Sequence, residues 1–382
     1  MRTGLMRALD RYLGTVLCAA AALIARLWRR RPACDPPRSI LIVKCLGLGS
    51  ICLAARALSA VRRAYPDARI TFLTFAENRE LLAPLGVVDQ VLALRTDGLL
   101  GFGADTSRIV WRLVRGRFDV ALDLETASRF TAILTWLSGA PSRVGLVTNA
   151  GPRRRLLTHP VAWDERKHVS KAFCDVAATA GAGDAGESAP PLQVPRADRS
   201  RADEMLAEAG IPEGDQLVVV NVNAGPVSLE RRWPQEHFAQ LARWLLDQQE
   251  LPLVFIGTAA ERRYVAEAVG RIGDDRAINM AGATDVGCLL AMLARAKLLI
   301  TNDTGPLHLA AALGTPTVSF FGPETPERYG PPGDGHTVLR APVACSPCLS
   351  AGNMKTAPCR GDNLCMRQIP VADAVAAVQR YL

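Results

Sequence analysis

The chain has 382 residues, which exceeds one typical domain of about 150 residues, so two domains are the default expectation. Its hydrophobic content of 49% and charged content of 21% describe a globular protein and exclude a disordered one. The net charge of +8 favours an anionic partner, such as a nucleic acid, a membrane surface or a phosphorylated glycolipid. Neither zinc-finger spacing nor interleaved basic and aromatic residues supports nucleic acid, so the other two partners are favoured.

The N-terminal segment has the pattern of an amphipathic helix. Its apolar stripe comprises Leu5, Leu9, Leu13, Val16, Leu17, Ala20, Leu23, Ile24 and Leu27. The uninterrupted apolar core, Tyr12 to Ala25, is shorter than the roughly 20 residues that span a bilayer. The arginines of this segment fall mostly off the stripe, and Trp28 is followed by three further arginines. We therefore predict a helix that lies in the membrane surface. Packing of this helix on its own domain is the alternative, and residues 32–37 are expected to form a linker.

Residues 38–194 are predicted to form a first α/β domain. Apolar runs at 39–43, 69–74, 87–94 and 120–122 are typical of buried strands, and helical segments separate them. This alternation predicts a parallel sheet covered on both faces. A glycine turn containing Gly47, Gly49 and Ser50 follows the first strand, and such a turn lets a ligand approach the backbone.

Two carboxylates, Asp123 and Glu125, follow the strand at 120–122. Ligands of open α/β sheets gather at the carboxyl ends of strands, and alternation puts both side chains on the same side of an extended chain. The alternative is that they cap the next helix or pair with Arg129. The basic segment that begins at Arg153 would attract an anionic acceptor or form a solvated charged loop.

Residues 195–370 are predicted to form a second α/β domain, after a linker at 180–191 that is rich in small residues, proline and glycine. Its most informative stretch is a strand at 296–300, a turn through Asp303-Thr304-Gly305, a helix opened by Pro306, and a strand at 317–321. The free N–H groups and the dipole at such a helix N-terminus predict a bound phosphate or pyrophosphate.

The motif D-T-G-P-x-H-x-A-A-A-L-G-T-P, followed by F-G-P-E-T-P-E-R-Y-G-P, resembles the donor-binding signature of the heptosyltransferase family, glycosyltransferase family 9. The resemblance runs from about Ile40 to the C-terminus. It implies the GT-B fold, in which two Rossmann-like domains face a cleft, and a closing helix at 371–382 that packs back on the first domain. It also implies a monomer at the cytoplasmic face of the bacterial inner membrane.

The activity that the resemblance implies is inverting, metal-independent transfer of a sugar from a nucleotide-diphosphate sugar, typically ADP-heptose, with no further cofactor. The acceptor would be a lipid-linked saccharide such as a lipopolysaccharide core. The implied donor site comprises Asn223, Ser228, Arg231, Glu261, Gly282, Asp303, Thr304, Gly305 and His308. Within it, Arg231 replaces a lysine that contacts the diphosphate, Glu261 would meet the ribose, and Gly282 would lie under the base.

The chain departs from the family pattern at Ser50, where the glycine turn normally ends in the aspartate proposed as the catalytic base. A neutral hydroxyl cannot take a proton from an alcohol without its own base. The chain resembles a subgroup that pairs this loss with a D-x-E motif after the later strand. We therefore predict Glu125 as the general base and Asp123 as the second candidate, with Gly47, Gly49, Ser50 and Arg129 on the acceptor side.

The ten cysteines are expected to be thiols in a cytoplasmic chain. Four of them, Cys345, Cys348, Cys359 and Cys365, could form a structural zinc site or a disulfide, although the second pair is spaced too widely for a usual knuckle. Three other functions stay open: a transferase of different sugar specificity, a non-catalytic descendant that binds glycolipid or nucleotide sugar, and an epimerase.

Overall fold

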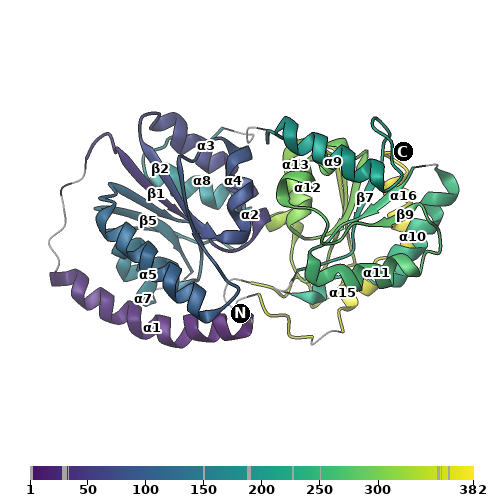
Figure 1. The fold of residues 1–382 in the computed structure, drawn as a ribbon. Helices are drawn as coiled ribbons and strands as arrows, with labels where there is room; N and C mark the ends of the chain where they lie inside the picture. Colours follow the sequence, from purple (N-terminus) through teal and green to yellow (C-terminus); the bar gives the residue numbers. More distant parts are fainter. Residues whose placement is uncertain are drawn as a thin grey trace. The chain divides into compact units, whose positions relative to one another are not determined.

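The computed structural model describes residues 3–27, 32, 34–148, 151–186, 191–225, 228–249, 251–350, 353, 355–359 and 362–382; side chains are described from residue 10, and not at 26–27. The chain divides into two compact units, Met1–Pro190 and Pro191–Leu382 (Figure 1). Each unit contains one six-stranded parallel sheet with helices packed on it. The prediction of two parallel-sheet α/β domains is therefore confirmed.

The sheet of the first unit has the strand order β3-β2-β1-β4-β5-β6. Its strands are β1 (Ser39–Val43), β2 (Arg69–Phe75), β3 (Gln90–Leu94), β4 (Val120–Asp123), β5 (Ser142–Val147) and β6 (His159–Ala162). Strand β1 is an almost continuous aliphatic run, as expected of a parallel strand that is buried on both faces.

The helices of the first unit are α1 (Thr3–Leu27), α2 (Leu48–Leu53), α3 (Ala55–Ala64), α4 (Arg79–Leu85), α5 (Leu99–Arg115), α6 (Arg129–Leu137), α7 (Pro152–Leu156) and α8 (Val169–Thr179). One apolar core lies between the sheet and helices α5 and α6, where Leu41, Ile109 and Leu134 are buried together. Helices α3 and α8 pack against each other, and α8 also contacts β5. Helix α6 contacts both β1 and β4.

Helix α1 packs on helices α6 and α7 of the same unit (Figure 1). The residues that make this contact are small, and Cys18, Ala21 and Ala22 share a buried cluster with Ala132 and Leu156. Packing on its own domain, the alternative considered for this segment, is what the structure contains. No helix in the described residues has the length and apolar character needed to cross a membrane. Trp28 and the arginines after it lie outside the described residues.

The sheet of the second unit has the strand order β12-β11-β10-β7-β8-β9. Its strands are β7 (Val218–Asn221), β8 (Leu253–Phe255), β9 (Ala277–Asn279), β10 (Leu298–Asn302), β11 (Thr317–Phe321) and β12 (His336–Arg340). Its helices are α9 (Arg196–Glu208), α10 (Gln235–Gln248), α11 (Arg262–Gly270), α12 (Val286–Arg295), α13 (Gly305–Leu313), α14 (Pro326–Tyr329), α15 (Leu364–Arg367) and α16 (Val371–Val378).

The two sheets have the same topology. In each, the first strand in sequence (β1 or β7) is hydrogen-bonded to the fourth (β4 or β10), and the second and third strands lie on its other side. The strand order therefore reverses between β1 and β4, and between β7 and β10. Open α/β sheets bind ligands outside the carboxyl ends of the strands at such a switch point.

The closing helix is packed within the second unit, and its expected packing on the first domain stays a prediction. Helix α16 packs on α10, β11 and β12 within the second unit. Its residues Ala374, Ala377 and Val378 are buried in the core that also contains Phe238. A further tie is the hydrogen bond from the Trp233 indole N–H to the carbonyl of Ile369, 3.1 Å long. These apolar residues of α16 are thus buried in the core of the second unit.

Candidate functional site

The switch point of the first sheet begins with the glycine turn between β1 and α2. Gly47 has a φ of +84°, a conformation that favours glycine because side chains crowd the backbone there. Gly49 is buried in the first turn of α2, and a Cβ at Gly47 would lie 3.3 Å from the Ser50 hydroxyl oxygen. The turn therefore brings Gly47, Gly49 and Ser50 together, and their place on the acceptor side stays a prediction.

Glu125 holds this turn from the end of β4. Its Oε1 atom accepts hydrogen bonds from the backbone N–H groups of Cys45 and Leu46, at 2.9 and 2.7 Å. It also accepts one from the Lys44 ammonium group at 2.9 Å, and both side chains are nearly buried. These three donors fix the orientation of the carboxylate. In the described part of the chain, no donor is seen at the second oxygen, Oε2.

Asp123 lies deeper than Glu125 and is paired with an arginine. Its Oδ2 atom is 3.0 Å from Nη1 of Arg153, and its Oδ1 accepts the backbone N–H of Glu125 at 3.1 Å. The Asp123 side chain is 0% exposed, whereas Glu125 keeps 9% of its side-chain surface exposed. Burial raises the pKa of Asp123, and the Arg153 guanidinium opposes this rise. Of the two carboxylates, only Glu125 keeps any side-chain surface exposed.

The basic segment was expected either to attract an anionic acceptor or to form a solvated loop. Arg153 does neither, because it is buried. It donates to the backbone carbonyls of Glu125, Ser128 and Leu146 and so shapes the loop between β4 and α6. The sequence alone could hardly have singled out Arg153 as the buried arginine. Two further arginines, Arg154 and Arg155, follow it directly, and both are exposed.

Arg129 pairs with Asp10 of α1 rather than with either carboxylate after β4. Oδ1 of Asp10 accepts the backbone N–H groups of Arg129 and Phe130 at 3.0 and 2.8 Å. It therefore caps the N-terminus of α6, together with the hydroxyl of Ser128, the N-cap residue. The pairing of Asp123 or Glu125 with Arg129, one alternative from the sequence, is not what the structure contains.

In the second unit, asparagine side chains connect the ends of β7 and β10. The Asn221 amide donates to the hydroxyls of Thr301 and Thr304, at 3.1 and 2.8 Å. The Asn302 amide donates to the carbonyls of Val222 and Asn223, at 3.1 and 3.0 Å. Asn302 and Asn221 were not predicted as site residues, although polar side chains at strand ends are a usable signal.

Arg231 brings a positive charge to the turn after β10. Its Nη1 atom donates to the Asp303 carbonyl at 2.8 Å and lies 3.3 Å from Oδ2 of the same residue. Its Nη2 atom donates to the carbonyl of Ala224 at 2.7 Å. The predicted donor residue Ser228 is buried, and its hydroxyl donates to Glu230 at 2.8 Å. Arg231, Asp303 and Ser228 therefore belong to one cluster.

The turn after β10 leads into α13, which has Pro306 near its start. Thr304 occupies the N-cap position in an extended conformation, and its side chain makes no cap hydrogen bond. The Thr304 hydroxyl contacts Asn221 and Thr301 instead, so this side chain does not cap the positive end of the helix dipole. His308 lies in the first turn of α13 and is buried. The arrangement suits an anion such as a diphosphate.

Glu261 and Gly282 lie at neighbouring turns of the second sheet. Oε2 of Glu261 accepts the backbone N–H of Thr258 at 2.9 Å and its hydroxyl at 2.8 Å, which completes a capping box. Gly282 has a φ of +74°, and a Cβ there would lie 2.6 Å from Cα of Ala259. This turn therefore requires glycine for two reasons, its conformation and the close approach of the backbone.

A buried acid and base near Asp303 were not predicted. Glu324 accepts hydrogen bonds from Arg328, at 3.1 Å, and from Lys355. Burial raises the pKa of Glu324 and lowers that of Lys355, and the charge of Asp303 acts on both groups. The motif F-G-P-E-T-P contains Glu324, but Lys355 lies in a separate loop that the sequence does not connect to it.

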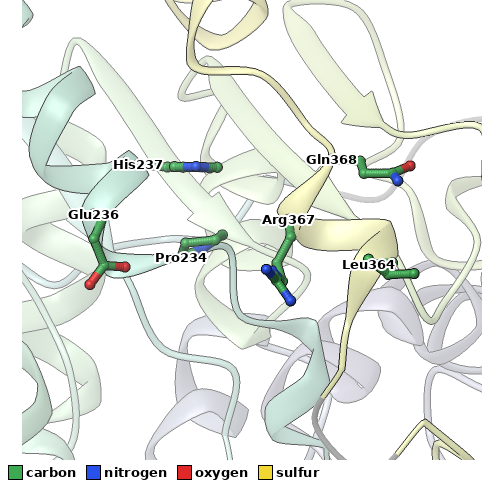
Figure 2. A pocket seen from close by; sticks show the side chains of 6 residues that line it. All are labelled: Pro234, Glu236, His237, Leu364, Arg367 and Gln368. Carbon is green, nitrogen blue, oxygen red and sulfur yellow. The ribbon is translucent and has the colours of Figure 1, made fainter.

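No disulfide joins any of the ten cysteines, all of which lie among the described residues, so the four C-terminal ones form none. Among the described residues, no group of three or more His, Cys, Asp or Glu side chains is arranged to hold a metal ion. A surface pocket of about 400 Å³ is lined by Pro234, Glu236, His237, Leu364, Arg367 and Gln368 (Figure 2). It lies between the start of α10 and the segment of α15, and it shares no residue with the predicted donor site.

The chain is similar to proteins of known identity and to solved structures. The chain is 24% identical over 310 residues to lipopolysaccharide heptosyltransferase 2 of Escherichia coli strain K12, covering 77% of this chain and 85% of the relative. A solved structure of a family 9 glycosyltransferase from Veillonella parvula has a TM-score of 0.74 at 23% identity, covering 90% of this chain and 97% of the other. The structure of E. coli ADP-heptose lps heptosyltransferase II has a TM-score of 0.72 at 21% identity, covering 90% and 98%.

These two structures share the fold of this chain. A sequence profile of glycosyltransferase family 9 (heptosyltransferase) matches residues 107–357, which is well over half of the chain. The matched residues include β4 with its two carboxylates, and the turn from β10 into α13. The chain therefore belongs to glycosyltransferase family 9, the heptosyltransferases.

Proposed function

We propose that the protein transfers a heptose from ADP-heptose to a lipid-linked saccharide such as a lipopolysaccharide core, with inversion at the anomeric carbon. The observation that carries this proposal is the N-terminus of α13, which has no side-chain cap and lies beside Arg231. The names of related proteins, which include ADP-heptose and lipopolysaccharide, support the choice of donor and acceptor.

The donor diphosphate binds at the turn Asp303-Thr304-Gly305. The N–H of Gly305 and the dipole of α13 attract its negative charge, and Arg231 supplies a full positive charge to the same turn. His308, in the first turn of the helix, is the further donor-side group. These groups stabilise the charge that develops on the diphosphate as it leaves, and no other cofactor takes part. Gly282 and Glu261 accept the nucleoside.

Glu125 acts as the general base through Oε2, since Oε1 is occupied by Lys44 and two backbone amides. The acceptor hydroxyl gives its proton to this carboxylate while its oxygen forms a bond to the anomeric carbon. The bond from that carbon to the diphosphate breaks in the same step, and ADP leaves. Asp123 is a positioning residue, because it holds Arg153 and the loop that presents Glu125.

The enzyme acts as a monomer at the cytoplasmic face of the inner membrane, where a lipid-linked acceptor would be available. The net charge of +8 supports contact with an anionic surface and an anionic acceptor. Two alternatives use the same residues: transfer of another sugar, and a descendant that binds nucleotide sugar or glycolipid without catalysis. The serine at position 50 is the observation that favours the second alternative.

The test is transfer from a panel of nucleotide sugars to purified lipopolysaccharide core by the wild type, Glu125→Gln and the control Glu77→Gln. Glu77 is an exposed glutamate of the same unit. We expect transfer from ADP-heptose, and a fall in kcat of about 10²–10⁴-fold for Glu125→Gln alone, with ADP affinity retained. Turnover of a different nucleotide sugar would establish another specificity, and no turnover with any donor would establish the binding protein.

A structural role of Glu125 must be separated from a catalytic one. Glutamine keeps an amide oxygen that can accept the N–H groups of Cys45 and Leu46, so the fold of the turn is largely preserved. If Glu125→Gln lowers the thermal unfolding temperature strongly and kcat falls only in proportion to the folded fraction, the base is elsewhere. If unfolding is little changed while kcat collapses, the base is Glu125.

A further inference from the structure

Helix α1 turns its small side chains toward the protein and its large apolar side chains toward solvent. Gly14, Cys18, Ala21 and Ala22 are buried against the first unit. The side chains that point outward are Tyr12, Leu13, Val16, Leu17, Leu23 and Ile24, which are between 46% and 71% exposed. We call these six residues the outer face of α1. A helix that served only to complete a water-soluble domain would bury these side chains instead.

The docking that creates this orientation is specific. Asp10 caps the N-terminus of α6, and the Cys18 thiol donates to the carbonyl of Arg129 at 3.6 Å. A Cβ at Gly14 would lie 2.9 Å from Cβ of Arg129, so the helices approach too closely for a larger residue. Rotating α1 to bury its outer face would lose these contacts. The exposed apolar surface is therefore built into the fold.

The outer face is concentrated and free of acidic residues. Six of the thirteen large apolar side chains that are exposed in the described part of the chain lie on this one helix. Soluble proteins seldom expose contiguous apolar surface unless it contacts a partner or a membrane. Residues 11–25 contain no aspartate or glutamate, so a low-dielectric partner would meet no buried acid there.

Exposed arginines lie on α1 and on a helix packed against it. Arg11 is exposed on α1 itself. Arg154 and Arg155 are exposed on α7, which packs directly on α1 (Figure 1). A large apolar stripe accompanied by exposed arginines on the same helix and on an adjoining one suits a bilayer interface, where acyl chains lie below anionic headgroups. A protein partner would instead need acidic side chains opposite these arginines.

We propose that the outer face of α1 inserts into the interfacial region of an anionic lipid bilayer while its inner face stays docked on α6 and α7. The helix would then lie in the membrane plane as a fixed part of the first unit. Because Asp10 also caps α6, next to the loop that contains Glu125, membrane contact and the first switch point share one rigid connection. This inference does not depend on the transfer reaction, since it concerns lipid contact alone.

The test is flotation of the full chain with phosphatidylcholine vesicles, with and without phosphatidylglycerol. The first variant combines Leu13→Gln, Val16→Gln and Leu17→Gln, which keeps helix propensity and adds no charge. We expect its partition coefficient to fall by at least about tenfold on both kinds of vesicle, because three large apolar side chains leave the bilayer. A second variant, Arg11→Gln with Arg154→Gln, should lose only the increase that phosphatidylglycerol gives.

The matched control is Leu364→Gln, an exposed leucine of the second unit, which should bind vesicles like the wild type. Because the outer face is exposed, the triple variant should keep the thermal unfolding temperature of the wild type. Wild-type binding that is absent, or a triple variant that binds unchanged, would overturn the proposal. So would a wild-type dimer in sedimentation that the triple variant converts to a monomer, since the outer face would then be covered by a second copy.

Discussion

The ammonium nitrogen of Lys44 lies 2.9 Å from Oε1 of Glu125 and joins the end of β1 to the end of β4. Lys44 is the first residue after β1, and Glu125 comes two residues after the end of β4. The ion pair and the two backbone amides beside it tie the glycine turn to the loop that presents the proposed base. The Glu125 carboxylate and the glycine turn that ends in Ser50 are thus connected directly by hydrogen bonds.

Replacing Lys44 by methionine should lower the free energy of unfolding by about 3 kcal/mol, because a buried carboxylate loses its cationic partner. Urea denaturation followed by circular dichroism measures this change. Lys171→Met, at an exposed position of the same unit, should change the free energy by less than about 0.5 kcal/mol. Equal stabilities for the two variants would contradict a stabilising role for the Lys44–Glu125 pair.

Replacing Arg153 by glutamine should destabilise the protein by about 3–5 kcal/mol at pH 7, because the charge of Asp123 is left buried without its partner. Burial already raises the pKa of Asp123 in the folded state, and the loss of Arg153 raises it further. A group whose pKa is raised on folding supports the folded state below its unfolded pKa, and this support is lost as the pH rises through the folded pKa. The destabilisation should therefore shrink as the pH falls.

Urea denaturation at pH 7 and pH 5 checks this dependence, with Arg154→Gln as the exposed neighbouring control. A gap between Arg153→Gln and the wild type that widens toward acid would mean that Asp123 is not the group left unpaired.

Replacing Asp10 by alanine should cost about 1 kcal/mol, the usual value for removing a helix cap. The N–H groups of Arg129 and Phe130 would lose their acceptor, and α1 would lose a polar tie to α6. Hydrogen exchange should therefore quicken at the start of α6 and along α1. Asp10→Asn keeps an acceptor oxygen and should recover most of the protection. Unchanged exchange in the alanine variant would show that the small-residue contacts alone hold α1 in place.

Replacing Gly282 by alanine should lower the free energy of unfolding by about 2 kcal/mol or more, through a left-handed backbone conformation and a clash with Ala259. Gly273 is a matched control, since it has a φ of +76° and open space around its Cβ position. Gly273→Ala should cost only about 1 kcal/mol. Calorimetry with ADP should show weaker binding for Gly282→Ala alone. Equal costs at both positions would mean that Ala259 moves away freely.

Replacing Arg231 by glutamine should weaken ADP binding by about tenfold or more, the loss expected for one hydrogen bond to a charged group. The turn at Asp303 would also lose its cation. Arg231→Lys keeps the charge without the planar fork, so its ADP affinity should lie between those of the wild type and Arg231→Gln. Arg263→Gln, at a side chain that is 93% exposed, is the control. Retained affinity in Arg231→Gln would place the diphosphate away from this turn.

The sequence by itself determined the two α/β units and the turn from β10 into α13. Both depend on local signals: continuous aliphatic runs such as 39–43, and a glycine-proline pair that opens a helix. The amphipathic pattern of α1 was also visible, because a three- to four-residue period needs no tertiary contact.

Only the tertiary structure decided the partners of the charged residues and the faces of the terminal helices. Glu125 meets Lys44 across 81 residues of chain, and Asp123 selects Arg153 rather than the exposed arginines beside it. In α1 the described part of the apolar stripe, from Leu13 to Ile24, lies on the exposed face, because Gly14 and the small residues near it allow the closer approach to α6. Periodicity defines two faces of a helix, but long-range packing decides which one is buried.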